Sequence, residues 1–144
     1  MNELAWLATR PVWRLGNPRI ASIVPTYQQR HIQHLTAFHQ VIVQYCPFFH
    51  LAQSLMSERR ILIPDVVDDP SYCVALHELG HVLEPTQRRI NVVEAWIGTP
   101  NIHHNEISAW RWAQEHALWW TPEMDAVMQY SLSTYGILTA VPKS

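Results

Sequence analysis

The segment from His77 to His81, with the sequence H-E-L-G-H, constrains this chain most, because its chemistry works only on a helix. Residues four apart share one helical face, so the two imidazoles could bind a single metal ion. Glu78 directly follows the first histidine, and its carboxylate could therefore reach a water on that metal. About 0.03 such motifs are expected by chance in a chain of this composition. The motif predicts a helical metal site of the kind found in zinc hydrolases.

The residues around the motif predict a helix that is buried on one side. Ala75, Leu79 and Val82 recur at helical spacing and would form its apolar back. Gly80 costs about 1 kcal/mol relative to alanine inside a helix, so it needs a structural reason. We therefore expect another segment of the chain to approach the helix closely at this glycine.

Prolines and hydrophobic spacing divide the rest of the chain into elements. We expect an irregular arm over residues 1–25, a long amphipathic helix over 26–45, a shorter helix over 48–57 and a strand over 60–64. The motif helix should have Asp69 as its N-cap and Pro70 at its first position, and should close at Glu84. Beyond it we expect a strand over 90–97, a turn over 98–101, and helices over 105–120 and 122–135. The fold class is α+β with helix dominant, in a single domain over residues 1–144.

Composition argues against several classes of protein. The net charge of −2 gives no broad electrostatic reason to bind nucleic acid or an anionic membrane. The N-terminus is no evident signal peptide, and no apolar run reaches the roughly 18 residues that span a bilayer. Cys46 and Cys73 are too few for a disulfide scaffold. We expect a cytoplasmic protein without nucleic acid or membrane as partner, and the sequence leaves its oligomeric state open.

Glu106 is the best third metal ligand after the two histidines of the motif. A catalytic zinc usually takes three protein ligands and keeps a position open for water. Glu106 shares a helical face with Ala109, Trp110 and Ala113, and small alanines there would let this helix pack closely on the motif helix. The alternative is that Glu106 merely stabilises the N-terminus of its own helix.

Other side chains compete for a place at the metal. His103 and His104 are chemically good ligands and could instead contact substrate or the oxyanion. Cys73 stands four residues before His77 on the same helical face, and its alternative role is that of a small buried residue. These alternatives stay open on the sequence alone.

The later part of the chain resembles the ImmA/IrrE-type metallopeptidases. The H-E-L-G-H helix is followed by a helix of the form E-x-x-A-x-x-W-A, then a leucine and a proline, at Glu106, Ala109, Trp112, Ala113, Leu118 and Pro122. The resemblance covers residues 72–122, and the tryptophan stands where that family usually has phenylalanine. It implies His77, His81 and Glu106 as zinc ligands, Glu78 as general base, and a minimal zincin-like, gluzincin-like core. That core has the motif helix, a small sheet and a second helix carrying the third ligand. The family is common in phage and mobile-element proteins.

We therefore expect a zinc metalloendopeptidase that binds one Zn²⁺ ion and hydrolyses peptide bonds of a protein or peptide substrate. Zinc and Glu78 would activate the water. A further donor should stabilise the oxyanion, and the candidates are His103, His104, Tyr72, Tyr130 and Tyr135. The alternative is a zinc-containing binding or sequestering protein, an inactive peptidase-like fold acting on a host or phage regulatory partner. Its contact surface would be Trp119 and Trp120, or the N-terminal arm.

Overall fold

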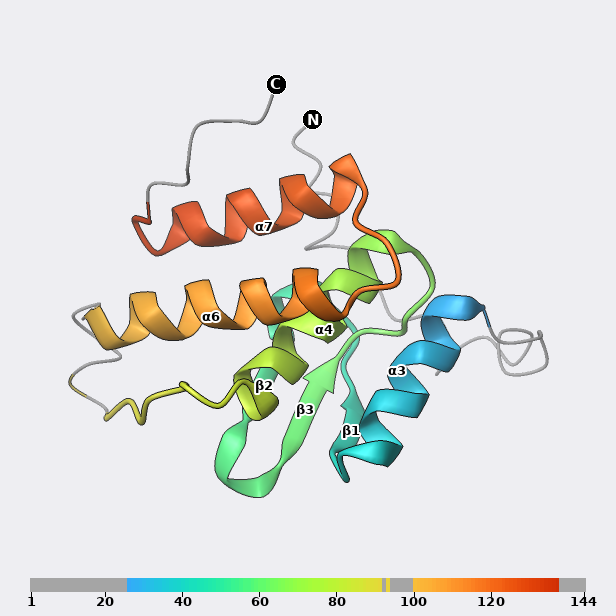
Figure 1. Cartoon of the computed structure of the whole chain (residues 1–144), viewed down its shortest axis with the longest axis horizontal. Helices are drawn as coiled ribbons and strands as arrows, with labels where there is room; N and C mark the ends of the chain where they lie inside the picture. The colour runs from blue at the N-terminus through green and yellow to red at the C-terminus, as the bar shows by residue number, and fades with distance from the viewer. Residues whose placement is uncertain (1–25, 92, 94–99, 138–144) are drawn as a thin grey trace.

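A computed structural model describes residues 26–91, 93 and 100–137, except for the side chain of His50 (Figure 1). The predicted arm over residues 1–25 lies outside this description. The elements in chain order are α3 (Tyr27–Phe38), β1 (Ile42–Tyr45), β2 (Gln53–Leu55), β3 (Arg60–Ile63), α4 (Asp69–Leu83), α6 (Pro100–His116) and α7 (Pro122–Thr134). Short 3-10 helices lie at Phe49–Leu51 and Met56–Glu58. The predicted α+β, helix-dominant class is confirmed.

The small sheet has β3 at its centre, in the order β1-β3-β2. Strand β3 pairs in parallel with β1 and antiparallel with β2. Ile61 and Ile63 of β3 are completely buried, as expected for branched apolar residues on the covered face of a sheet. The strand predicted over 60–64 is thus confirmed, and β2 is left at one edge of the sheet.

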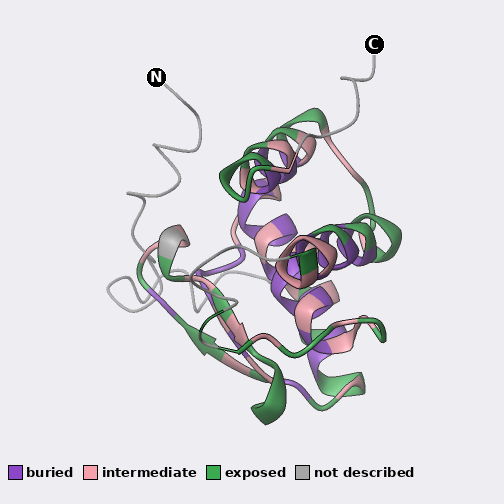
Figure 2. Cartoon of the chain, turned by 90° about the vertical axis from the view of Figure 1, so that its left-hand side faces the viewer, coloured by how far each residue is buried: buried purple, intermediate pink, exposed green. Residues whose placement is uncertain are grey.

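Helix α4 lies at the centre of the fold, between the sheet on one side and α6 and α7 on the other (Figure 1). It also contacts α3, so little of its surface remains exposed. Buried residues concentrate where these layers meet (Figure 2). Ala75, Leu76 and Leu79 of α4 are completely buried and Val82 is buried as well, which confirms the predicted apolar back. Among the described residues, no helix combines the length and apolarity needed to cross a bilayer.

The structure corrects the predictions for residues 26–58. The predicted long helix ends at Phe38, and after a turn with Gln40 at φ 56° the residues up to Tyr45 form β1. The predicted helix over 48–57 is wrong, because this stretch holds the first 3-10 helix, β2 and the start of the second 3-10 helix. Ile42 and Tyr45 happen to fit helical spacing, yet they are β-formers with β3 available as a partner. Pairing with a distant strand decided the structure of a locally ambiguous segment.

Helix α4 starts one residue away from its predicted cap. Asp68, rather than Asp69, is the N-cap, and its carboxylate accepts a hydrogen bond from the Ser71 backbone N–H at 3.0 Å. The Ser71 hydroxyl in turn accepts from the Asp68 N–H at 3.1 Å, which completes a capping box. The helix closes at Glu84 as predicted.

Boundaries beyond α4 are corrected as well. Helix α6 begins at Pro100, so the predicted turn is wrong at residues 100 and 101, and the helix ends at His116 instead of near residue 120. Of the strand predicted over 90–97, Ile90 and Asn91 are irregular and Val93 is helical, and the other residues lie outside the description. Helix α7 ends one residue before its predicted end.

Helices α4 and α6 come into direct contact at Gly80. A Cβ built on this glycine would lie 2.5 Å from the carbonyl oxygen of Ala109 and 3.0 Å from its Cα. Real side chains do not approach a backbone this closely. The close approach predicted for Gly80 is therefore confirmed, and Ala109 is the residue that makes it.

Candidate metal centre

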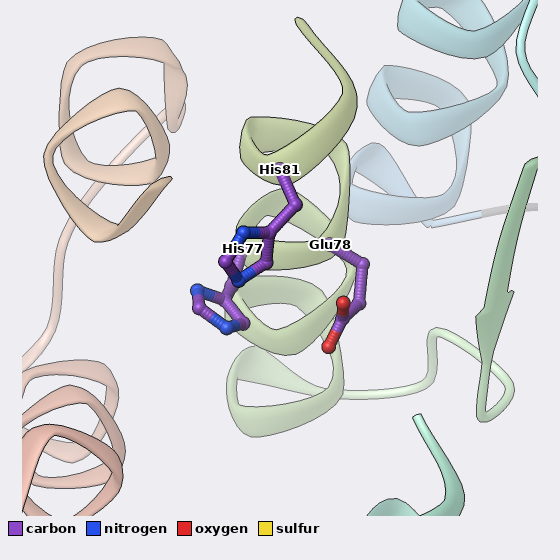
Figure 3. A group of neighbouring side chains, drawn as sticks. All are labelled: His77, Glu78 and His81. Carbon is purple, nitrogen blue, oxygen red and sulfur yellow. The ribbon is translucent and has the colours of Figure 1, made fainter. Parts of the chain in front are cut away.

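The two motif histidines project from the same side of α4, one turn apart (Figure 3). Their ring centroids are 4.6 Å apart, and the rings are nearly perpendicular at 75°. Glu78 leaves the same helix beside them, turned toward the strands (Figure 3). Donor atoms of His77, Glu78 and His81 all lie within 4.8 Å of one another. The helix alone thus brings two nitrogen donors and one carboxylate to a single point.

Glu106 reaches this point from α6. Its Oε2 lies 2.7 Å from Nε2 of His81, and its Oε1 lies 3.4 Å from Nε2 of His77. Because α6 begins at Pro100, Glu106 is outside the first helical turn, and the alternative role at the helix N-terminus is excluded. The carboxylate instead lies against both imidazoles, where the sequence placed the third ligand.

One pair of donor atoms has the spacing of a zinc site. Bonds of about 2.1 Å in tetrahedral geometry place two ligand atoms roughly 3.4 Å apart. The 3.4 Å separation of His77 and Glu106 matches that spacing, while the 2.7 Å separation of His81 and Glu106 is a hydrogen bond. Among the described residues, Oε1 of Glu106 is buried without a hydrogen-bond partner. An unsatisfied buried acceptor costs about 1–3 kcal/mol, and a cation bound there would satisfy it.

The ionisable groups at the site have shifted pKa values. Burial opposes the charged form of Glu106, but the neighbouring imidazoles of His77 and His81 outweigh it and lower the pKa to about 2. Burial likewise opposes charge on His81, but the hydrogen bond to Glu106 prevails and raises its pKa to about 9. Burial raises the pKa of Glu78, partly offset by the histidines and by a hydrogen bond with Ser54. Glu106 is thus anionic and suited to a cation, and Glu78 is a stronger base than an exposed carboxylate.

Each histidine is held by a different neighbour. The Nδ1 of His81 lies 2.9 Å from Oε1 of Gln87. The ring of His77 stacks on Trp110 of α6, with centroids 4.1 Å apart and planes inclined by 19°. Helical spacing predicts Trp110 on the face of Glu106, but it does not predict this stacking on His77. Gln87 follows α4 in an irregular stretch, where no periodic signal could have identified it.

A pocket of about 380 Å³ opens onto the site. Gln53 and Ser54 of the edge strand β2 line one part of it, and Ile90, Ile102 and Tyr135 line others. The pocket therefore joins an exposed strand edge to the candidate metal ligands. Ser54 and Ile102 are further site residues that the sequence analysis did not single out.

Of the five predicted oxyanion or substrate contacts, the structure places only Tyr135 at the pocket. Tyr135 is 43 % exposed, and the buried part of its phenol, then the negative charges of Glu106 and Glu78, raise its pKa to about 12. The phenol is therefore a proton donor at neutral pH.

The other four predicted contacts lie elsewhere. His104 donates from Nε2 to the Thr86 carbonyl at 2.9 Å, and His103, its neighbour on α6, does not line the pocket. Tyr72 is completely buried, and its hydroxyl contacts Nδ1 of His31 at 2.6 Å. Tyr130 is exposed on α7.

The two cysteines have no part in this centre. Cys73 is completely buried and donates to the Pro70 carbonyl oxygen at 3.2 Å. Burial raises the pKa of its thiol well above the usual value. The thiol is also not part of the group of donor atoms around His77 and His81. Cys46 is also buried, and both cysteines are free. Of the two roles considered for Cys73, the structure supports the small buried residue.

Comparisons with protein-family models, with curated proteins and with solved structures give no match. The chemistry of the site is therefore inferred from its own residues: two imidazoles and a carboxylate that converge, a second carboxylate beside them, and a pocket bounded by a strand edge.

Proposed function

We propose that this protein is a zinc-dependent metalloendopeptidase that hydrolyses peptide bonds of a protein or peptide substrate. The observation that carries the proposal is the convergence of Glu106 from α6 on His77 and His81 from α4, with Glu78 beside them. The same donors occur in catalytic zinc sites, which have three protein ligands and an open position.

His77, His81 and Glu106 would hold one Zn²⁺ ion. Bound in this way, zinc acts as a Lewis acid that lowers the pKa of a water toward about 7 and polarises a carbonyl. Both imidazoles would bind through Nε2, the nitrogen that faces Glu106. The carboxylate supplies negative charge at a site where burial makes its interaction with a cation strong.

Glu78 would act as the general base and then as the general acid. It takes a proton from water as the water oxygen bonds to the peptide carbonyl carbon. It then gives that proton to the departing amine nitrogen as the C–N bond breaks. Its hydrogen bond with Ser54 of β2 holds the carboxylate toward the strand side of the pocket.

An extended peptide fits the edge of β2. Within the described residues, this strand pairs with β3 on one side and ends the sheet order on the other, and Gln53 and Ser54 line the pocket. An unpaired strand edge can hydrogen-bond the main chain of an extended peptide regardless of its side chains. That mode of binding would carry a scissile bond past Glu78. It supports a protein or peptide as the substrate.

Tyr135 is the proposed oxyanion donor. It lines the pocket as a protonated phenol, and developing negative charge on the carbonyl oxygen would be stabilised by a donor there. The other predicted donors do not line the pocket. Tyr135 is also the C-cap residue of α7, so a third helix contributes to the site.

The relation to ImmA/IrrE-type metallopeptidases, with the phage or mobile-element setting it implies, is part of this proposal. The packing of the Glu106 helix on the motif helix through Ala109 and Gly80 supports it.

Glu78→Gln tests the peptidase proposal. The variant should bind zinc as the wild type does and lose roughly 10²–10⁴-fold in peptide hydrolysis, because the amide cannot accept the proton. Glu115→Gln, the same change at an exposed residue of α6, is the matched control and should retain activity. Zinc content by elemental analysis and cleavage of a quenched fluorescent peptide library provide the readouts. Cleavage by Glu78→Gln at the wild-type rate would refute the role of Glu78 as general base. A biological effect that survives this change would instead favour the binding protein.

A further inference from the structure

We infer that Gln87 is a positioning residue that holds a proton on Nδ1 of His81 and thereby presents the Nε2 lone pair to the metal. The inference rests on the proposed zinc site and adds a residue to it. Gln87 touches neither the reacting atoms nor the metal position. It acts through His81 alone.

Three short contacts define the geometry. Oε1 of Gln87 lies 2.9 Å from Nδ1 of His81. The amide Nε2 of Gln87 donates to the backbone carbonyl of Asn105 at 3.0 Å and to the Ser108 hydroxyl at 2.7 Å. Gln87 therefore bridges a histidine of α4 and two residues of α6.

The direction of the hydrogen bonds follows from the Asn105 carbonyl. A carbonyl oxygen can only accept, so the Gln87 atom that faces it must be the NH₂ group. The other end of the amide is then the carbonyl oxygen, which also can only accept. Nδ1 of His81 must therefore carry a proton. Nε2 donates to Glu106 at 2.7 Å in this structure, and it is the nitrogen that would give up its proton and turn its lone pair to the metal. One backbone carbonyl on α6 thus selects the His81 tautomer that binds metal through Nε2.

The loop that bears Gln87 is fastened next to the third ligand. The Asn105 side chain accepts from the Arg88 N–H at 2.7 Å and donates to the Arg88 carbonyl at 2.7 Å. Asn105 immediately precedes Glu106 on α6. The anchor for Gln87 and the third ligand are therefore consecutive residues of one helix. This arrangement links the orientation of His81 to the position of Glu106.

His77 shows why the effect should be specific to one histidine. Its Nδ1 is buried without a hydrogen-bond partner among the described residues, and its ring is held by stacking on Trp110. Gln87 contacts His81 and not His77. Loss of the Gln87 contact should therefore change proton exchange at Nδ1 of His81 and leave the His77 ring unchanged.

Two substitutions at Gln87 separate a hydrogen-bonding role from a space-filling one. Gln87→Met keeps the length of the side chain and removes both hydrogen-bonding ends. Gln87→Glu keeps an acceptor for Nδ1–H of His81. Gln44→Met, the same change on the exposed strand β1, is the matched control. Zinc affinity is measured by competition with a chromophoric chelator, and the histidine ring protons are measured by ¹⁵N NMR in metal-free and zinc-loaded protein.

We expect Gln87→Met to bind zinc 10–100-fold more weakly, the usual loss when such a supporting contact is removed. Gln87→Glu, which keeps the acceptor for Nδ1–H but loses the two N–H donations to α6, should recover part of that loss, and Gln44→Met should match the wild type. The Nδ1 proton of His81 should exchange slowly in the wild type and rapidly in Gln87→Met. Wild-type affinity in Gln87→Met, or equal losses in the Met and Glu variants, would overturn the inference. If the wild type binds no zinc, the proposed site itself fails. The exchange of the Nδ1 proton in metal-free protein then decides the role of Gln87, and an unchanged rate in Gln87→Met refutes it.

Discussion

The backbone carbonyl of Ala109 lies against the Cα of Gly80, so closely that even a methyl group between them would stand 2.5 Å from the oxygen. This contact joins the helix of the two histidines to the helix of Glu106. The glycine lies next to His81, and Ala109 lies three residues after Glu106. The separation of the two helices at the site is therefore set by the absence of a side chain.

Gly80→Ala should destabilise the protein and weaken metal binding. Alanine is favoured over glycine in a helix by about 1 kcal/mol, but forcing a methyl group against backbone typically costs about 1–3 kcal/mol. Because the helices must move apart, we expect zinc affinity to fall as well. The measurements are urea unfolding and chelator competition. Gly136→Ala provides a contrast. A Cβ built at this position would have no heavy atom within 4 Å apart from its chain neighbours, so the only cost is that alanine disfavours the φ of +71°. It should cost stability without affecting zinc, and an unaffected zinc affinity in Gly80→Ala would contradict this account of the contact.

Glu106→Gln should abolish the stabilisation that zinc confers. The change keeps the shape of the side chain and removes the negative charge that lies 2.7 Å from His81. A ligand at one hundred times its Kd stabilises the folded state by about 2.7 kcal/mol, and a chelator would remove this gain. We expect the wild type to unfold at a higher temperature with zinc than with chelator, and Glu106→Gln to show little difference. Glu115→Gln, exposed on the same helix, should behave as the wild type. An undiminished zinc effect in Glu106→Gln would remove Glu106 from the ligands.

Trp110→Leu should weaken zinc binding beyond what its loss of stability explains. Trp110 is almost completely buried, and its indole stacks on His77 at 4.1 Å. Truncating a buried tryptophan costs roughly 3 kcal/mol, and here it also frees the ring of a metal ligand to rotate. Trp112→Leu is the matched control, because Trp112 is similarly buried but stacks on His116 at 3.9 Å. Both variants should unfold more readily, measured by urea titration, and only Trp110→Leu should lose zinc affinity. Equal zinc affinities in the two variants would count against a role for the stack.

The parts of the fold that could be predicted from sequence depend on local spacing. Helix α4 follows from the apolar periodicity behind the H-E-x-x-H motif, and Glu106 follows from the small residues on its own helical face. Gly80 predicts a close contact, because glycine is unfavourable inside a helix unless another segment needs the space. In each case the evidence lies within a few turns of one helix, where side-chain direction is fixed by residue number.

The parts that could not be predicted depend on distant partners. Strand β1 satisfies helical spacing, and only the presence of β3, which pairs Ile42 with Arg60, makes it a strand. Gln87 lies in a stretch without regular structure, so nothing local directs it toward His81. The predicted start of α6 near Asn105 was wrong for a different reason. Pro100 was assigned to a turn, although proline is equally suited to the first turn of a helix.

Alkaline pH should destabilise the protein through Tyr72, which does not line the pocket. Its hydroxyl is completely buried, accepts from the Leu118 N–H at 2.9 Å, and contacts His31. Burial raises the pKa of Tyr72 from 10.0 to about 12. Between these values the folded state keeps a proton that the unfolded state releases. The stabilisation is therefore fully present below pH 10 and is lost as the pH rises to 12.

Tyr72→Phe tests this pH dependence. The variant should be less stable than the wild type at pH 8, because the Leu118 N–H loses its acceptor, yet its stability should fall less between pH 10 and pH 12. Urea unfolding at several pH values measures the slope, and absorbance of tyrosinate gives the titration directly. Tyr130→Phe, at an exposed position, should leave the wild-type slope nearly unchanged. The same alkaline slope in Tyr72→Phe and the wild type would show that another group is responsible. Because Tyr72 does not line the pocket, zinc affinity at pH 8 should be the same in Tyr72→Phe and the wild type. An unchanged affinity would support a structural role for Tyr72 rather than a role as oxyanion donor.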